Sequence, residues 1–160
     1  MGMQDASYYF ENHFALEERL VALVDLVRHQ LAGAVPDTPA IYIGYSQGAT
    51  MGALLMPSHA AAFPLVLLVE GGYEQWPMFS ARRFVNHGGR KVYFACGTQS
   101  CNAGAQRSVR WLTQAGAEAR LGYARGAGHT PTGAVGEHAR EGLLWLMDSV
   151  DPMSAEGDHP

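Results

Sequence analysis

Short apolar segments alternate along the chain with segments whose apolar residues recur at helical spacing. The apolar segments predict strands at residues 40–43, 63–69, 90–96 and, more weakly, 117–124. The intervening segments predict helices at residues 16–31, 49–56, 76–87, 105–115 and 135–147. Strands that alternate with helices are typical of a parallel sheet with right-handed crossovers. The pattern therefore predicts an α/β fold, with a parallel sheet of about four strands between layers of helices.

Local signals place the ends of these elements. Asn12 can cap the first helix, because its side-chain oxygen can accept a hydrogen bond from an N–H group of the first turn. Pro57 is expected to end the second helix, and residues 97–102 are expected to form a loop before the fourth. The chain has 160 residues, so we expect one domain at residues 1–149, followed by a flexible polar tail at residues 150–160.

The segment Gly44-Tyr45-Ser46-Gln47-Gly48 joins the first predicted strand to the second predicted helix. Gly-x-Ser-x-Gly between a strand and a helix is typical of a sharp turn that presents a nucleophilic hydroxyl at the carboxyl end of a sheet. The flanking glycines are expected because a Cβ atom there would hold strand and helix apart. The N–H of Gln47 would then face an oxyanion formed when Ser46 attacks a carbonyl. The alternative is a tight turn that uses glycine only for packing.

The order of elements and motifs over residues 40–147 resembles the α/β-hydrolase superfamily. The matching motifs are Gly-Tyr-Ser-Gln-Gly at 44–48, Leu-Val-Glu-Gly at 68–71, Phe-Ala-Cys-Gly-Thr at 94–98 and Gly-Ala-Gly-His at 126–129. The resemblance implies a serine hydrolase that acts on an ester-like acyl bond and needs no metal or organic cofactor. It also implies that these strands are the C-terminal half of the family's sheet.

Family members carry further strands before the serine, whereas only one predicted helix precedes residues 40–43 here. The resemblance therefore implies an α/β-hydrolase-like domain that is incomplete on its N-terminal side. The strand at residues 40–43 is then expected to have an unpaired edge, and we expect self-association through it or poor solubility. The loop that supplies a second oxyanion donor in the family belongs to the absent part, so no second donor is assigned.

Ser46 needs a general base, because a hydroxyl group is a weak nucleophile by itself. His129 is the candidate, since it follows the last predicted strand in a glycine-rich loop. The resemblance implies the same residue, because the family's triad runs serine, acid, histidine along the chain. The alternative is a histidine that only caps the helix after it.

The acid of the triad is harder to assign. The family usually places an aspartate in the loop that corresponds to residues 97–102, and that loop contains no carboxylate here. Glu70 is our candidate, because it follows the strand at residues 63–69, where some family members carry their acid, and because a carboxylate beside so apolar a segment needs a partner. The alternatives are Asn102, Gln99, Glu74 and no acid at all. Glu70 could also be a loop carboxylate bonded only to the N–H groups of Gly71 and Gly72.

Cys96 and Cys101 lie on either side of this loop. They can form a small disulfide in an oxidising compartment or remain two thiols in the cytosol, and the sequence leaves both open. A disulfide would stiffen the loop and hold it against His129, and the resemblance implies a device similar to that of cutinases. A metal site would need further ligands spaced near the pair, and none is found. A thiol oxidoreductase is disfavoured, because the spacing is not Cys-x-x-Cys.

Composition narrows the choice of partners. The chain is 48% hydrophobic and carries a net charge of −4, so it lacks the basic stripe of a nucleic-acid-binding protein. Its apolar runs are too short to span a membrane, and residues 1–10 lack a signal-peptide pattern, so no compartment is assigned. The expected partner is a small-molecule acyl substrate in an open cleft, because the connection after Glu70 is too short for a large lid. The competing hypothesis is a non-catalytic α/β-hydrolase remnant that acts as an interaction module.

Overall fold

The structure is a computed structural model that describes residues 12–32, 34 and 39–148. The chain divides into two compact units, residues 1–38 and 39–160. The first contains helix α1 (His13–Gln30), and Asn12 caps it as predicted by accepting a hydrogen bond of 3.0 Å from the Ala15 N–H. The single domain over residues 1–149 stays a prediction, and the expected flexible tail lies outside the described residues.

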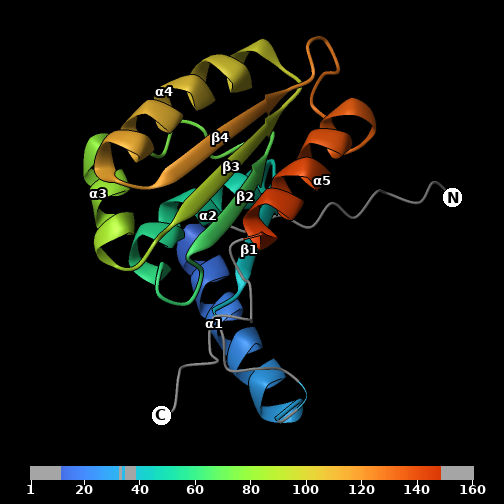
Figure 1. Cartoon of the computed structure of the whole chain (residues 1–160). Helices are drawn as coiled ribbons and strands as arrows, with labels where there is room; N and C mark the ends of the chain where they lie inside the picture. Colours follow the sequence, from blue (N-terminus) through green and yellow to red (C-terminus); the bar gives the residue numbers. More distant parts are fainter. Residues whose placement is uncertain (1–11, 33, 35–38, 149–160) are drawn as a thin grey trace, which may run out of the picture. The chain divides into compact units, whose positions relative to one another are not determined.

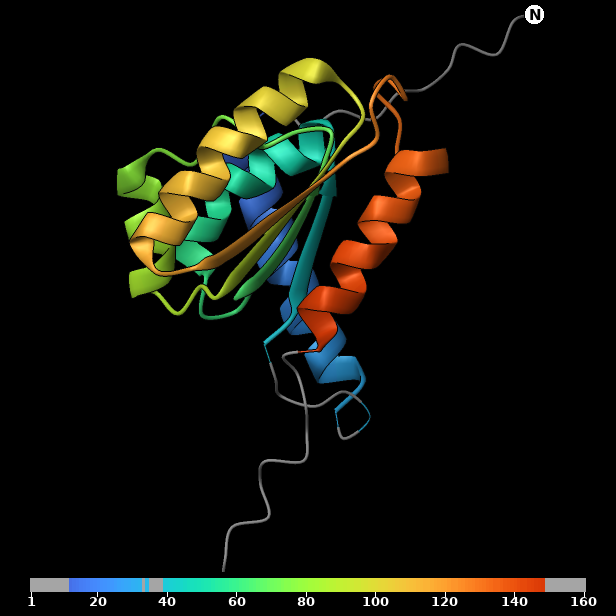
Figure 2. The same ribbon diagram turned by 45° about the horizontal axis from the view of Figure 1, so that its top comes forward.

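The second unit confirms the predicted α/β fold (Figure 1). Its parallel sheet has the order β1-β2-β3-β4 and consists of β1 (Ile41–Tyr45), β2 (Leu65–Val69), β3 (Lys91–Cys96) and β4 (Glu118–Tyr123). The helices of this unit are α2 (Gln47–His59), α3 (Met78–Asn86), α4 (Gln99–Ala115) and α5 (Gly133–Met147). The α2, α3 and α4 helices lie on one side of the sheet, and α5 lies on the other (Figure 2). Crossovers of one hand produce this layering when strands are added in one direction.

The two central strands are buried along their whole length, which explains the continuous apolar sequence of β2 and the apolar run that follows Lys91 in β3. Alternate side chains point to opposite faces of a strand. Leu65, Leu67 and Val69 of β2 therefore share a core with Val135 and Leu146 of α5. The intervening residues of β2 and β3 face the layer that contains α2 and α4. Within the described residues, β1 pairs only with β2, so it is an edge strand of the sheet as expected.

Two predicted boundaries were wrong. The α2 helix does not stop at Pro57 but continues to His59, since a proline in the last turn removes only one hydrogen bond from the helix. The predicted loop at residues 97–102 is confined to residues 97 and 98, and residues 99–102 instead form the first turn of α4, which begins at Gln99. Thr98 caps this helix by accepting a hydrogen bond of 3.3 Å from the Cys101 N–H.

The register of the sheet brings three chain segments together at its carboxyl edge. Tyr45 pairs with Val69, and Val69 pairs with Ala95, so β1, β2 and β3 end side by side. The next residues continue this pairing. Ser46 N–H donates to the Val69 carbonyl at 2.9 Å, and Glu70 N–H donates to the Ala95 carbonyl at 3.0 Å. Residues that are distant in the sequence therefore become neighbours where the strands end.

Among the helices that the structure describes, none is both long enough and apolar enough to cross a membrane.

Candidate functional site

Ser46 occupies a strained turn between β1 and α2. Its backbone has φ 50° and ψ −113°, a conformation that residues with a Cβ rarely adopt. A Cβ at Gly44 would lie 2.7 Å from the Ala49 backbone nitrogen, so glycine is required there for the helix to approach the strand. The same prediction for Gly48 was wrong, because a Cβ at that position would meet no atom within 4 Å. Only the glycine before the serine is needed for packing.

Tyr42 fastens the start of α2 to the strand. Its hydroxyl donates a hydrogen bond of 2.7 Å to the Gly48 carbonyl, and its ring fills the space where a Cβ at Gly52 would lie. Burial raises the pKa of Tyr42 to about 12, because the phenolate would lose its hydration. The neutral hydroxyl therefore remains a donor to the first turn of α2, next to Ser46.

Gln47 is the first residue of α2. Backbone N–H groups in the first turn of a helix face its N-terminal end, where the helix dipole favours negative charge. Gln47 also lines the same cleft as Ser46 and His129. Its position is therefore compatible with the predicted role as an oxyanion donor, which stays a prediction.

His129 reaches the serine from the glycine-rich loop after β4. Its Nε2 lies 2.9 Å from the Ser46 Oγ. The loop comes close to the end of β3 because Gly97 has no side chain; a Cβ there would lie 2.4 Å from the Gly128 carbonyl oxygen. The Tyr45 hydroxyl donates to the His129 carbonyl at 3.3 Å and adds a second attachment of the loop to β1.

Glu70 lies directly after β2 and is almost completely buried, with 1% of its side chain exposed. Its Oε2 lies 3.2 Å from the His129 Nδ1. The rest of the carboxylate is held by the segment after β3. Gly97 and Thr98 donate their N–H groups to Oε1, and the Thr98 hydroxyl donates to Oε2 at 2.9 Å. Backbone and hydroxyl donors of this kind offset the cost of burying a carboxylate.

The structure therefore brings together Ser46, His129 and Glu70 in one hydrogen-bonded series. Comparisons with protein-family models, curated proteins and solved structures found no match to this chain. The structure by itself shows a small α/β domain with a four-stranded parallel sheet.

The three side chains meet beside a cleft of about 430 Å³ that contains room for a small molecule. Its walls are formed by residues 46, 47, 50, 70–75 and 129. The short stretch Gly71–Gln75 borders the cleft on one side, and Glu74 at this border is 65% exposed. A hydroxyl, an imidazole and the start of a helix face the same space, which is the set of groups that acyl transfer requires.

The alternative acids lie elsewhere. Glu74 is an exposed residue whose carboxylate forms an ion pair with Arg107 at 3.8 Å. Gln99 and Asn102 belong to the first turn of α4 and line a neighbouring cavity of about 480 Å³ together with Arg125. Of the candidates considered for the acid, the one that contacts the His129 ring is Glu70.

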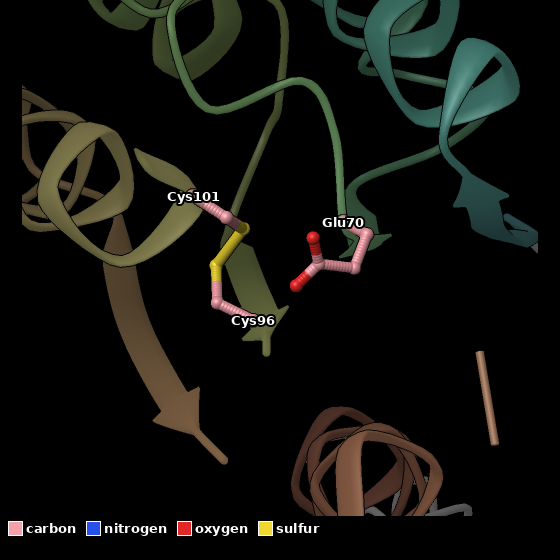
Figure 3. A group of neighbouring side chains, drawn as sticks. All are labelled: Glu70, Cys96 and Cys101. Atoms are coloured by element: carbon pink, nitrogen blue, oxygen red, sulfur yellow. A yellow bond between two sulfur atoms is a disulfide. The ribbon is translucent and has the colours of Figure 1, made fainter. Parts of the chain in front are cut away.

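Cys96 and Cys101 form a disulfide in the structure, with their Cα atoms 5.5 Å apart. Figure 3 shows the bonded sulfurs beside the Glu70 carboxylate. The disulfide closes the short segment that contains Gly97 and Thr98, and these residues supply the donors to that carboxylate. The cross-link therefore restrains the support of the acid and does not act on His129 directly.

Sequence reasoning missed the part played by Thr98. Its hydroxyl accepts from the Cys101 N–H, which caps α4, and donates to Glu70. A threonine directly after an apolar strand and a glycine is a helix-capping signal. That signal could have placed the start of α4, but the contact with Glu70 depends on the alignment of β2 with β3.

Proposed function

We propose that the protein is a serine hydrolase that cleaves an ester-like acyl bond. The observation that carries this proposal is the series from Ser46 Oγ to His129 Nε2 at 2.9 Å and from His129 Nδ1 to Glu70 Oε2 at 3.2 Å. Support also comes from the strained backbone of Ser46 at the start of a helix. Nucleophile, base and orienting acid in hydrogen-bonded sequence are the parts that hydroxyl activation requires.

In the proposed mechanism, the neutral imidazole carries its proton on Nδ1, and this N–H donates a hydrogen bond to the Glu70 carboxylate. Nε2 then accepts the proton of the Ser46 hydroxyl while Oγ attacks the acyl carbon. The imidazolium that forms is stabilised by the buried carboxylate. It next protonates the leaving alcohol, which departs and leaves an acyl-enzyme. Water attacks this intermediate with the same histidine as base, and the released Oγ recovers its proton.

The N–H of Gln47 is the proposed donor to the oxyanion of both tetrahedral intermediates. Such a donor stabilises the transition state by roughly 3 kcal/mol when its position is fixed before the reaction begins. The cleft beside Ser46 suits a small or extended acyl group. The proposal is acyl transfer from an ester-like bond, the step that esterases, lipases, thioesterases, peptidases and acyltransferases share.

Hydrolysis of short p-nitrophenyl esters tests the proposal. We expect turnover by the wild-type protein and its loss in Ser46→Ala, with the fold checked by circular dichroism. Ser80→Ala, which changes a serine of α3, is the matched control and should retain wild-type turnover. Equal rates for the two variants, or no turnover by well-folded wild type over a panel of acyl groups, would contradict the proposal.

A second candidate is an interaction module that uses β1. This strand pairs on one side only among the described residues, and Ile43 and Tyr45 on it are 54% and 37% exposed. Edge strands with exposed apolar residues favour strand pairing between chains. Light scattering at micromolar concentration should detect oligomers of wild type and fewer of Ile43→Lys. A wild-type protein that stays monomeric would exclude this candidate without affecting the hydrolase proposal.

A further inference from the structure

The parallel sheet brings a third potential metal ligand, Glu70, next to the two cysteines. Cys96 ends β3, Cys101 lies in the first turn of α4, and Glu70 follows β2. The two sulfurs and a carboxylate oxygen all lie within 4.8 Å of one another (Figure 3). Glu70 is 26 positions before Cys96 in the chain, so inspection of the residues around the cysteines could not find it. The alignment of β2 with β3 creates the cluster.

The cluster has the chemistry and the dimensions of a zinc site once the sulfurs are separated. Thiolate and carboxylate are both zinc ligands, with bonds of about 2.3 Å and 2.0–2.2 Å, and cysteines with four intervening residues match structural zinc sites. Two sulfurs on one tetrahedral zinc lie roughly 3.8 Å apart. In the disulfide the two sulfurs are covalently bonded, so they have to move apart to bind one ion.

Burial favours a cation here. The exposed fractions of Cys96, Cys101 and Glu70 are 0%, 1% and 3%. Two thiolates beside a carboxylate would place three negative charges in a region with little water, and buried charges are paired or coordinate metals. A divalent cation provides the compensating charge.

We propose that, when the Cys96–Cys101 disulfide is reduced, the two thiolates and Glu70 bind one zinc ion and so remove Glu70 from His129. A thiol reductant supplies two electrons and two protons to the disulfide and is itself oxidised to a disulfide. A phosphine supplies two electrons and takes the oxygen of a water molecule to become a phosphine oxide, and that water provides the two protons. Each resulting thiol releases its proton when its sulfur binds the cation. The three protein ligands leave one tetrahedral position for water. The metal site exists only in the reduced protein, and its inhibitory effect rests on the proposed hydrolase function.

Zinc binding would weaken the interaction of the Glu70 carboxylate with the His129 imidazole. A carboxylate that shares its electrons with zinc is a weaker acceptor for the Nδ1 proton and a weaker partner for imidazolium. Gly97 and Thr98, which hold Glu70, lie between the two cysteines and would shift with them. Zinc should therefore slow the attack by Ser46 without blocking the cleft.

The experiment compares reduced and oxidised wild-type protein. The reduced form is kept in a phosphine throughout purification, and mass spectrometry of alkylated protein verifies two free thiols. Zinc is added and the unbound ion is removed by gel filtration. We expect the reduced protein to retain about one more zinc per chain than the oxidised protein, which is the control for zinc bound by surface histidines. Cobalt(II) in place of zinc should give a thiolate-to-cobalt charge-transfer band in the near ultraviolet, in the reduced form only.

Cys96→Ser/Cys101→Ser is the second control, with its fold checked by circular dichroism. It should lose the excess zinc and the cobalt band. Glu70→Gln in the reduced protein should keep the band but bind zinc at least tenfold more weakly. Neither measurement requires turnover, so failure of the hydrolase proposal would leave this test intact. Equal zinc binding by the reduced wild type and the serine variant, absence of the cobalt band, or a disulfide that resists the phosphine would each overturn the proposal.

Discussion

Replacing Glu70 by glutamine should disable the proposed triad through the position of one proton. The carboxylate now accepts hydrogen bonds at both oxygens, from Gly97 and Thr98 at Oε1 and from Thr98 and His129 at Oε2. In glutamine, the oxygen will take the place of Oε1, because an NH2 group there would face two N–H donors. The NH2 group then lies at the place of Oε2 and donates to Nδ1 of His129. The imidazole must carry its proton on Nε2, where it can no longer accept the proton of Ser46.

The size of this effect follows from the two losses that the change combines. The tautomer becomes wrong for general base catalysis, and the imidazolium loses its buried counter-charge. The equivalent carboxylate-to-amide change in a serine-protease triad lowers kcat about 10⁴-fold, which corresponds to about 5 kcal/mol of transition-state stabilisation. We expect a loss of 10³- to 10⁴-fold here, with little change in KM, because Glu70 acts through His129.

Ester hydrolysis at fixed pH measures this effect, and Glu141→Gln is the matched control. Glu141 also bonds a histidine, with its Oε2 3.0 Å from the His138 Nδ1, but this pair is a surface contact on α5. Its loss should leave kcat unchanged. Asn102→Ala tests the other candidate for orienting the histidine and should have no more than a small effect. A Glu70→Gln protein that stays folded and retains a rate within about threefold of wild type would refute the reasoning.

Other predictions concern the supports of the site. Gly44→Ala should lower the free energy of unfolding by about 2 kcal/mol or more, because the added Cβ would clash with backbone atoms. Gly48→Ala should change the free energy of unfolding by under about 0.5 kcal/mol, and urea denaturation of both variants measures the difference. Thr98→Val should cost about 1 kcal/mol of stability through the lost cap and roughly tenfold in kcat through the lost hydrogen bond to Glu70, and Thr98→Ser should restore both. Ultraviolet titration should show Tyr42 ionising at about pH 12. Its pKa is raised above the unfolded value, so its stabilising contribution should be complete below about pH 10 and be lost towards pH 12. Tyr42→Phe should reduce that dependence, and the part that remains is expected from Tyr93, whose pKa burial also raises. Equal stability of the two alanine variants, full activity of Thr98→Val, or ionisation near pH 10 would contradict the respective prediction.

The fold was predictable because its elements differ strongly in hydrophobic pattern. The continuous apolar run in β2 indicates a strand buried on both faces, and in the structure all of its residues are buried. The start of α4 was not predictable from periodicity, since its first turn contains Gln99 and Ser100 and no apolar repeat. A capping threonine sets that boundary, and its signal is a single residue long.

The candidate site was predictable in part for a topological reason. Residues that follow parallel strands gather at one edge of a sheet, so the proximity of Ser46 to Glu70 required only that β1 and β2 be neighbours. The orientation of Glu70 towards His129 and the donors from Gly97 and Thr98 depend on the register of β2 with β3 and on the path of the loop after β4. A one-dimensional pattern does not contain that register. The same limitation hid the closeness of Glu70 to the cysteine pair.

Covalent labelling by a fluorophosphonate tests the central claim most directly, because the reagent reacts with a serine whose hydroxyl is activated by a neighbouring base. Mass spectrometry of the digested protein should locate one phosphonate on Ser46. His129→Ala, with the fold verified, should react at least 10³-fold more slowly. Absence of labelling in well-folded wild-type protein, labelling at another serine, or a rate that does not depend on His129 would contradict the account.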